Sequence, residues 1–125
     1  MAKSVLVVED EDSIALALEF LIQREGYEID RVSTGPAAIE AIRQKRPALV
    51  LLDVMLPGCS GYEVCEQIRG VDGGTEIKVL MMTASGGALE KRKAIAMGAD
   101  AFISKPFSPV ELIDTVNRLI EDEVA

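Results

Sequence analysis

The sequence predicts an α/β fold in which a parallel sheet lies between two layers of helices. Three observations predict it. Short apolar runs alternate with segments of helical period along the chain. The runs at 48–53 and 78–83 are continuously apolar, which is typical of strands covered on both faces. Five strand–helix units in succession imply right-handed crossovers and therefore a doubly wound sheet, a three-layer sandwich.

The first two units occupy the N-terminal part of the chain. The apolar run at 4–8 predicts a strand, and apolar residues spaced as one helix face over 14–22 predict a helix that ends near Gly26. Alternation of polar and apolar residues at 28–32 predicts an edge strand. A Gly-Pro pair then opens a helix that Pro47 closes.

The next two units repeat this order. Strand 48–53 is followed by a short helix over 62–69, and strand 78–83 is followed by a helix over about 89–97. A glycine follows each of these helices and marks its end. A short strand at 101–104 completes the predicted sheet.

The last helix has the clearest start signal in the sequence. Ser108 is predicted as its N-cap, Pro109 as its first helical residue, and Glu111 closes a capping box with Ser108. Apolar residues then recur at helical spacing over 112–120. This helix is therefore expected to pack a continuous apolar face onto the sheet.

Composition limits the classes of function. A chain of 125 residues with 49% hydrophobic content suits one domain, 1–125, with a core over about 3–121. Its 21 acidic and 13 basic residues give a net charge of −8, which disfavours direct binding to nucleic acid or to an anionic membrane. Neither a membrane span nor a signal peptide is indicated, so we expect a cytoplasmic protein.

The residue types restrict the chemistry further. The absence of histidine excludes Ser-His and Cys-His nucleophile pairs and histidine-ligated zinc. Cys59 and Cys65 have no further Cys or His to complete a metal site and are interpreted as buried or incidental thiols. Neither common glycine-rich nucleotide-binding motif is present. Any chemistry must therefore depend on carboxylates, lysine, hydroxyls and the backbone.

Polar side chains stand where four of the predicted strands end. Glu9 and Asp10 follow the first strand, Asp53 ends the third, Thr83 ends the fourth, and Lys105 follows the fifth. Taken singly, each is better interpreted as a solvated loop residue or a helix cap. Because the carboxyl ends of parallel strands form the ligand site of such sheets, however, the five side chains are expected to lie together.

Three neighbouring carboxylates, those of Glu9, Asp10 and Asp53, would repel one another unless a cation lay between them. Oxygen ligands of this kind suit a hard divalent ion, most naturally Mg²⁺ with several retained waters. Lys105 adds a fixed positive charge and Thr83 a hydroxyl donor. Together they predict a pocket for a phosphoryl group beside a metal ion.

In this order the residues resemble the receiver domain of bacterial response regulators, the phosphoacceptor modules of two-component signalling. The resemblance runs from about Lys3 to Leu119 and depends on four stretches, "VLVVEDE", "LVLLDVMLPGCSGYEV", "MMTAS" and "GADAFISKPFSPVEL". It implies a flavodoxin-like (βα)5 fold whose five parallel strands lie in the order 2-1-3-4-5.

The resemblance implies a role for each acidic residue. Asp53 corresponds to the phosphorylated aspartate. Asp10 and Asp53 correspond to direct Mg²⁺ ligands, joined by the backbone carbonyl of Met55, and Glu9 corresponds to a ligand that acts through water. Aspartate is also common at the position of Glu9. Met55 and Ser85 occupy positions that tune hydrolysis of the phosphoryl group, and we expect the apolar Met55 to shield it.

It also implies roles around the phosphoryl group. Lys105 corresponds to the lysine that contacts phosphoryl oxygens, Thr83 to the switch hydroxyl, and Ala84 to the small residue that lets the backbone approach. Phe102 stands at the switch-aromatic position, where tyrosine is frequent; the alternative is a core aromatic. The bond between Lys105 and Pro106 corresponds to a joint that is often cis.

The implied function is phosphoryl transfer to Asp53 from the phosphohistidine of a sensor histidine kinase or histidine phosphotransferase, or from a small acyl phosphate. Phosphorylation would draw Thr83 inward and remodel the face of the fourth helix, fifth strand and fifth helix for an output partner that the sequence does not identify. On this interpretation the domain is no enzyme beyond catalysing its own phosphorylation and dephosphorylation.

Two alternative functions stay open. An aspartate-nucleophile phosphatase would resemble D-x-D, with an acid two residues after Asp53 to protonate the leaving group, yet Met55 stands there. A pseudo-receiver would bind partners without being phosphorylated. The complete set of Asp10, Asp53, Thr83 and Lys105 argues against it.

The oligomeric state follows from one further part of the resemblance. Receivers of winged-helix transcription factors pair through the fourth helix, fifth strand and fifth helix by complementary charges. This chain has Lys93, Asp100 and Glu111 there, but Ala101 and Thr115 replace an acid and a base that are usual in that class. We therefore expect a domain that is mainly monomeric and dimerises at most weakly on activation.

Overall fold

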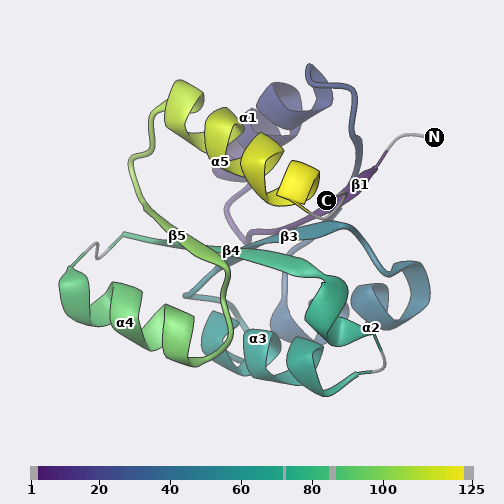
Figure 1. Cartoon of the computed structure of the whole chain (residues 1–125), viewed down its shortest axis with the longest axis vertical. Helices are drawn as coiled ribbons and strands as arrows, with labels where there is room; N and C mark the ends of the chain where they lie inside the picture. The colour runs from purple at the N-terminus through teal and green to yellow at the C-terminus, as the bar shows by residue number, and fades with distance from the viewer. Residues whose placement is uncertain (1–2, 72, 85–86, 123–125) are drawn as a thin grey trace.

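The computed structural model describes residues 3–71, 73–84 and 87–122, which form a parallel sheet between two layers of helices (Figure 1). The strand order is β2-β1-β3-β4-β5, so the predicted fold class and topology are confirmed. The strands are β1 (Ser4–Val8), β2 (Glu28–Val32), β3 (Leu49–Asp53), β4 (Lys78–Thr83) and β5 (Ala101–Ser104).

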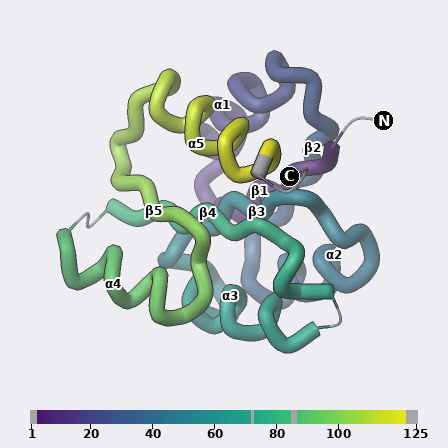
Figure 2. Tube along the Cα trace, in the orientation of Figure 1, coloured from purple at the N-terminus to yellow at the C-terminus, as the bar shows by residue number. Residues whose placement is uncertain are grey.

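The helices divide unequally between the two faces of the sheet. Helices α1 (Asp12–Gln23) and α5 (Pro109–Asp122) cover one face. Helices α2 (Gly35–Lys45), α3 (Gly61–Gly70) and α4 (Ala88–Ala96) cover the other, as the trace in Figure 2 also shows. A single 3-10 turn, η1 (Gly74–Glu76), precedes β4. None of the described helices is both long and apolar enough to cross a membrane.

Side chains of the central strands alternate between two cores. On β3, Val50 and Leu52 face the core under α2, α3 and α4, whereas Leu49 and Leu51 face the core under α1 and α5. All four are fully buried. The continuous apolar runs are therefore explained by burial on both faces, which is worth about 1.5–3 kcal/mol for each large aliphatic side chain.

Short polar residues start three of the helices. The hydroxyls of Thr34 and Ser60 each accept a hydrogen bond from the backbone N–H three residues later, at 3.2 Å in both cases. The predicted N-cap Ser108 accepts from the N–H of Glu111 at 3.4 Å. Each bond satisfies a backbone donor that the first helical turn leaves without a partner.

One glycine is required where α3 meets the end of β3. A Cβ atom on Gly61 would lie 2.2 Å from the carbonyl oxygen of Asp53, so no larger residue fits without displacing the backbone. The Gly61 N–H also donates to the carbonyl of Val54 at 2.8 Å. This close approach holds the residues that follow Asp53 firmly against the start of α3.

Candidate functional site

The parallel register brings four strand ends to one edge of the sheet. Val8 lies opposite Leu52, so Glu9 comes beside Asp53. Thr83 lies opposite Ser104, so Lys105 comes next to the same edge. Carboxylate oxygens of Glu9, Asp10 and Asp53 lie within 4.8 Å of one another. The structure thus brings together the acidic residues and the lysine that the sequence singled out.

Lys105 joins two of these carboxylates. Its Nζ lies 2.8 Å from Oε1 of Glu9 and 2.7 Å from Oδ2 of Asp53. The Lys105 side chain is 15% exposed, that of Glu9 is 0% exposed and that of Asp53 is 7% exposed. Removing Lys105 from so buried a group would leave two carboxylates without their counter-charge, and breaking a buried ion pair in this way typically costs about 3–5 kcal/mol.

Burial and pairing change the pKa values of this group in identifiable ways. Burial raises the pKa of the Glu9 carboxyl, while its hydrogen bonds to Lys105 and to the N–H of Glu11 act in the opposite direction. For Lys105, burial acts to lower the pKa, but the hydrogen bonds to Asp53 and Glu9 outweigh it and the pKa is raised. The lysine is therefore held as a cation next to the carboxylates.

The backbone fixes the other oxygen of Asp53. Its Oδ1 accepts a hydrogen bond from the N–H of Met55 at 3.0 Å. The Met55 side chain is 74% exposed and lies in the turn that follows β3. Asp10 is exposed as well, so the acidic cluster opens to solvent on this side. Ser85, the other residue that the sequence linked to hydrolysis, lies outside the described residues.

The two predicted switch residues lie on neighbouring strands. Thr83 is buried at the end of β4, and Ala84 follows it exposed. Phe102 on β5 is half-buried and packs against the core under α2, α3 and α4. Phe102 is thus a core contact in this conformation, and its role in switching stays a prediction. The peptide bond between Lys105 and Pro106 is cis.

Sequence reasoning missed Arg31 of β2. Its Nε and Nη2 donate to the carbonyl oxygen of Glu9 at 3.0 and 2.7 Å, and its Nη1 pairs with Oδ1 of Asp12 at 2.9 Å. These bonds hold the acidic loop after β1 in place. The only sequence signal was a basic residue in a predicted edge strand, directly across the sheet from the loop.

An apolar groove beside the site was also missed. It has a volume of about 450 Å³ and is lined by α1, by Lys105 and by the segment after β5. Ile14 and Ala17 form its helical side, and Pro106 and Phe107 form the other. A partner that reaches Lys105 would therefore meet apolar surface on both sides of the groove.

These features agree with the comparison with known families. A family model described as the response regulator receiver domain matches residues 5–117. The chain therefore belongs to the receiver domain family of two-component signalling. Receiver domains are signalling modules that interact with histidine kinases and output domains; they are not enzymes in the ordinary sense. Binding of Mg²⁺ in the active site is a general feature of the family.

Particular relatives support the same assignment. Sensory transduction protein RegX3 of Mycobacterium bovis is 41% identical over 117 residues, which cover 94% of this chain and 50% of that protein. The same protein of Mycobacterium tuberculosis gives the same values. The chain spans about half the length of these curated relatives.

Solved structures show the same fold. A response regulator of Chloroflexus aurantiacus has a TM-score of 0.92 at 32% identity, covering 97% of this chain and 99% of that chain. The receiver domain of sensor histidine kinase PA1611 from Pseudomonas aeruginosa has a TM-score of 0.89 at 25% identity, with the same coverage of both chains. That structure has a magnesium ion coordinated in its active site cleft.

Proposed function

We propose that Asp53 of this receiver domain accepts a phosphoryl group with the help of Mg²⁺. The observation that carries the proposal is the buried group of Glu9, Asp53 and Lys105 with Asp10 at its mouth. Three carboxylates within 4.8 Å form an oxygen donor set that suits this ion. Asp10, Asp53 and the Met55 carbonyl would hold it directly, and Glu9 through water. The ion would neutralise charge on the transferred group.

The residues of the chain would share the remaining work. An oxygen of Asp53 attacks phosphorus, the bond from phosphorus to the donor's imidazole nitrogen breaks, and an acyl phosphate forms on Asp53. The Met55 N–H and Lys105 orient the two oxygens of the nucleophile beforehand. After transfer, Lys105 faces the phosphoryl oxygens, and Ala84 leaves space for them beside the backbone.

The donor would be the phosphohistidine of a histidine kinase or a histidine phosphotransferase, or a small acyl phosphate, since the 125 residues include no histidine to carry the phosphoryl group. Binding of Thr83 to the phosphoryl group would draw its hydroxyl inward, and Phe102 would follow into the space that Thr83 leaves. The changed face of α4, β5 and α5 would then bind an output partner.

We further propose that 1–125 is one cytoplasmic receiver domain, mainly monomeric, that catalyses only its own phosphorylation and dephosphorylation.

Labelling with acetyl phosphate tests the assignment of Asp53. In the presence of Mg²⁺, intact mass spectrometry should show one added phosphoryl group on the wild-type chain and none on Asp53→Asn. The control is Asp114→Asn, which removes an exposed carboxylate from α5 and should label normally. Equal labelling of Asp53→Asn would contradict the proposal. Absence of labelling in the folded wild-type chain would favour a pseudo-receiver instead.

A further inference from the structure

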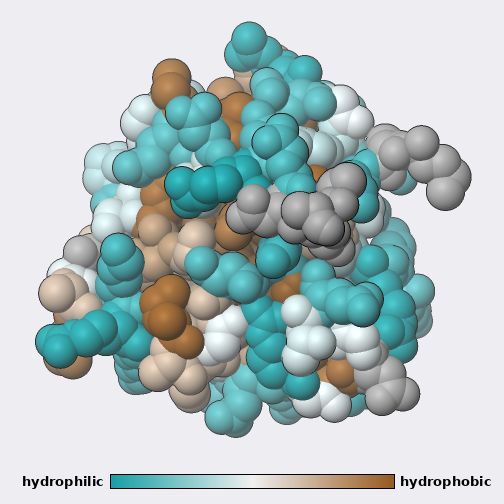
Figure 3. Space-filling view, viewed as in Figure 1, coloured by the Kyte–Doolittle hydropathy of each residue, from teal (hydrophilic) through white to brown (hydrophobic). Residues whose placement is uncertain are grey.

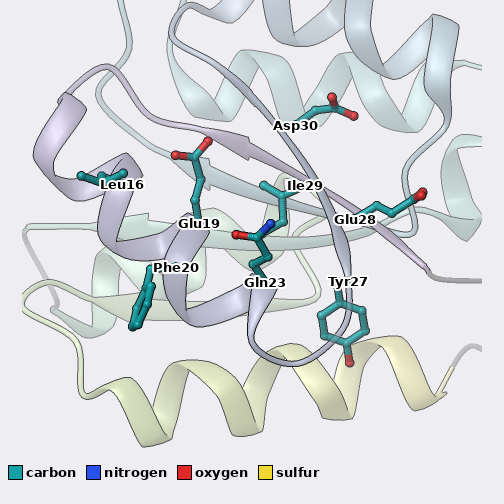
Figure 4. A pocket seen from close by; sticks show the side chains of 8 residues that line it. All are labelled: Leu16, Glu19, Phe20, Gln23, Tyr27, Glu28, Ile29 and Asp30. Carbon is teal, nitrogen blue, oxygen red and sulfur yellow. The ribbon is translucent and has the colours of Figure 1, made fainter.

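A second candidate binding surface lies between α1 and the edge strand β2 (Figure 4). It is a groove of about 780 Å³, and its strand side consists of residues 27–30, at the start of β2. The phosphoryl site lies at the opposite end of the strands, where β1 and β3 finish. The groove is therefore separate from the acidic cluster around Asp53.

Large apolar side chains on the helical side of this groove are mostly exposed. Leu16 is 68% exposed and Phe20 is 61% exposed, and they stand one turn apart on α1. Figure 4 shows both on the side of the helix that faces away from β2, whereas Glu19 and Gln23 lie on the side nearer to Ile29 of β2. Neighbouring exposed apolar side chains with a polar border are typical of a surface that binds another molecule.

The border of the groove is acidic. Within the part of the chain that the structure describes, the carboxylates of Glu19 and Glu28 form no hydrogen bond or ion pair. Asp30 is already neutralised by Lys45 at 2.9 Å. Arg24 lies over the Phe20 ring, 5.5 Å from its centroid, at one end of the apolar row. Two carboxylates beside the groove are thus available to a cationic ligand.

We propose that this groove binds a basic amphipathic helix of a partner protein. Leucine or phenylalanine side chains of that helix would pack against Leu16 and Phe20, and its lysine or arginine side chains would pair with Glu19 and Glu28 on the side nearer to β2. Residues one turn apart on α1 form a ridge that fits between the side-chain rows of a second helix. The site goes beyond the phosphoacceptor function and does not depend on it.

Other occupants fit this surface less well. An added strand would have to pair along β2, whose only neighbour among the described strands is β1, but Glu28, Asp30 and Arg31 place charges there that oppose edge-to-edge pairing. Nucleic acid and anionic membrane carry the same sign of charge as Glu19 and Glu28 and would be repelled. A basic helix satisfies both the apolar row and the acidic border.

The test uses a synthetic amphipathic helical peptide of leucine and lysine as the probe. Amide NMR spectra of the whole chain should show the largest peptide-induced shifts in α1 and at the start of β2. Isothermal titration should give an affinity that falls about tenfold in Phe20→Ser and again in a Glu19→Lys, Glu28→Lys variant. A peptide of the same pattern with glutamate in place of lysine should bind at least tenfold more weakly.

Matched control variants distinguish binding at this site from nonspecific binding of the peptide. Val110→Ser removes a side chain that is 69% exposed on α5, and Glu66→Lys reverses an exposed charge on α3; neither should change the affinity. The proposal is overturned if the largest shifts lie at the Asp53 loop or in α4, β5 and α5. It is also overturned if Phe20→Ser binds like the wild type, or if the glutamate peptide binds equally well. Asp53→Asn should bind the lysine peptide normally, which keeps this test independent of phosphorylation.

Discussion

Helices α4 and α5 precede and follow the strand β5 in the chain, but they are attached to the molecule in different ways. Helix α5 buries a continuous apolar face, made by Leu112, Val116, Leu119 and Ile120. In α4 only Ala94 is fully buried, while Leu89 and Ile95 are 70% and 46% exposed. Figure 3 shows apolar surface over the C-terminal part of α4.

Polar contacts replace the missing apolar ones in α4. The Tyr62 hydroxyl on α3 donates to Oε2 of Glu90 at 2.8 Å, and Nζ of Lys93 lies 4.4 Å from the centroid of the Tyr62 ring. We call Tyr62, Glu90 and Lys93 the Tyr62 cluster. A hydrogen bond and a cation–π contact contribute about 0.5–1.5 and 0.5–1 kcal/mol, so neither exceeds the about 1.5–3 kcal/mol of one buried leucine. The difference indicates that α4 is the helix that can move without unfolding the domain.

The largest expected effect is on stability. Leu112→Ala in α5 should lower the free energy of unfolding by about 2–5 kcal/mol, because it removes a fully buried side chain and leaves a cavity. Leu89→Ala in α4 should change it by less than about 0.5 kcal/mol, since that side chain is already in water. Urea denaturation followed by circular dichroism measures both. Similar losses in the two variants would show that α4 is anchored as firmly as α5.

A smaller effect should link the Tyr62 cluster to activation. Tyr62→Phe removes the hydrogen bond to Glu90 and should destabilise the resting position of α4 by about 0.5–1.5 kcal/mol. If that position opposes activation, beryllofluoride in the presence of Mg²⁺ should bind up to about fivefold more tightly, which corresponds to about 1 kcal/mol of coupling.

Tyr27→Phe is the matched control for this experiment. Tyr27 donates to Oδ1 of Asn117, so it ties the start of β2 to α5 just as Tyr62 ties α3 to α4. The control should lose a similar amount of stability without any change in the affinity for beryllofluoride. If both variants change that affinity equally, then α4 is not coupled to activation more strongly than α5 is.

The same cluster predicts a titration. Burial, together with the hydrogen bond and the negative charge of Glu90, raises the pKa of Tyr62 to about 12. Because the folded pKa lies above the usual 10, the stabilisation by the neutral phenol is complete below pH 10 and is lost as pH rises toward 12. Absorbance titration should show this late transition, and Glu90→Gln should move it to lower pH. If the transition has the same pKa in Glu90→Gln, then Glu90 does not raise the pKa of Tyr62.

The smallest expected effect is on assembly. Lys93 lies against Tyr62, and Asp100 pairs with Arg69 at 2.8 Å while it accepts from the N–H of Val79 at 2.8 Å. Both charges are thus used within the chain and are less available to a second copy. Gel filtration with light scattering should show a mainly monomeric domain with and without beryllofluoride. A clean activation-dependent dimer that dissociates on Lys93→Glu would contradict this prediction.

Sequence alone was sufficient for the elements whose pattern has a single physical reading. Continuous apolar runs located β3 and β4 to within one residue, because only burial on both faces explains them. The parallel order of the strands then brought Glu9, Asp53 and Lys105 to one edge. The start of α5 followed from Ser108 and the proline after it.

What the sequence did not reveal depends on contacts between distant residues. Arg31 binds the Glu9 carbonyl across 22 positions, and that contact exists only because of the register between β1 and β2. Asp100 was expected on an exposed pairing face, but Arg69 reaches it from α3. Periodicity assigns a residue to a face of an element, whereas its partner is decided by how the elements pack.

We expect phosphorylation of Asp53 to change mainly the position of α4. Amide NMR with Mg²⁺ and beryllofluoride, a mimic of the phosphoryl group, tests it most directly. Large shifts are expected at Asp53, Thr83 and Lys105 and along α4, smaller shifts over 112–120 of α5, and no response in Asp53→Asn. A response that persists in Asp53→Asn, or one that is largest over 112–120, would contradict it.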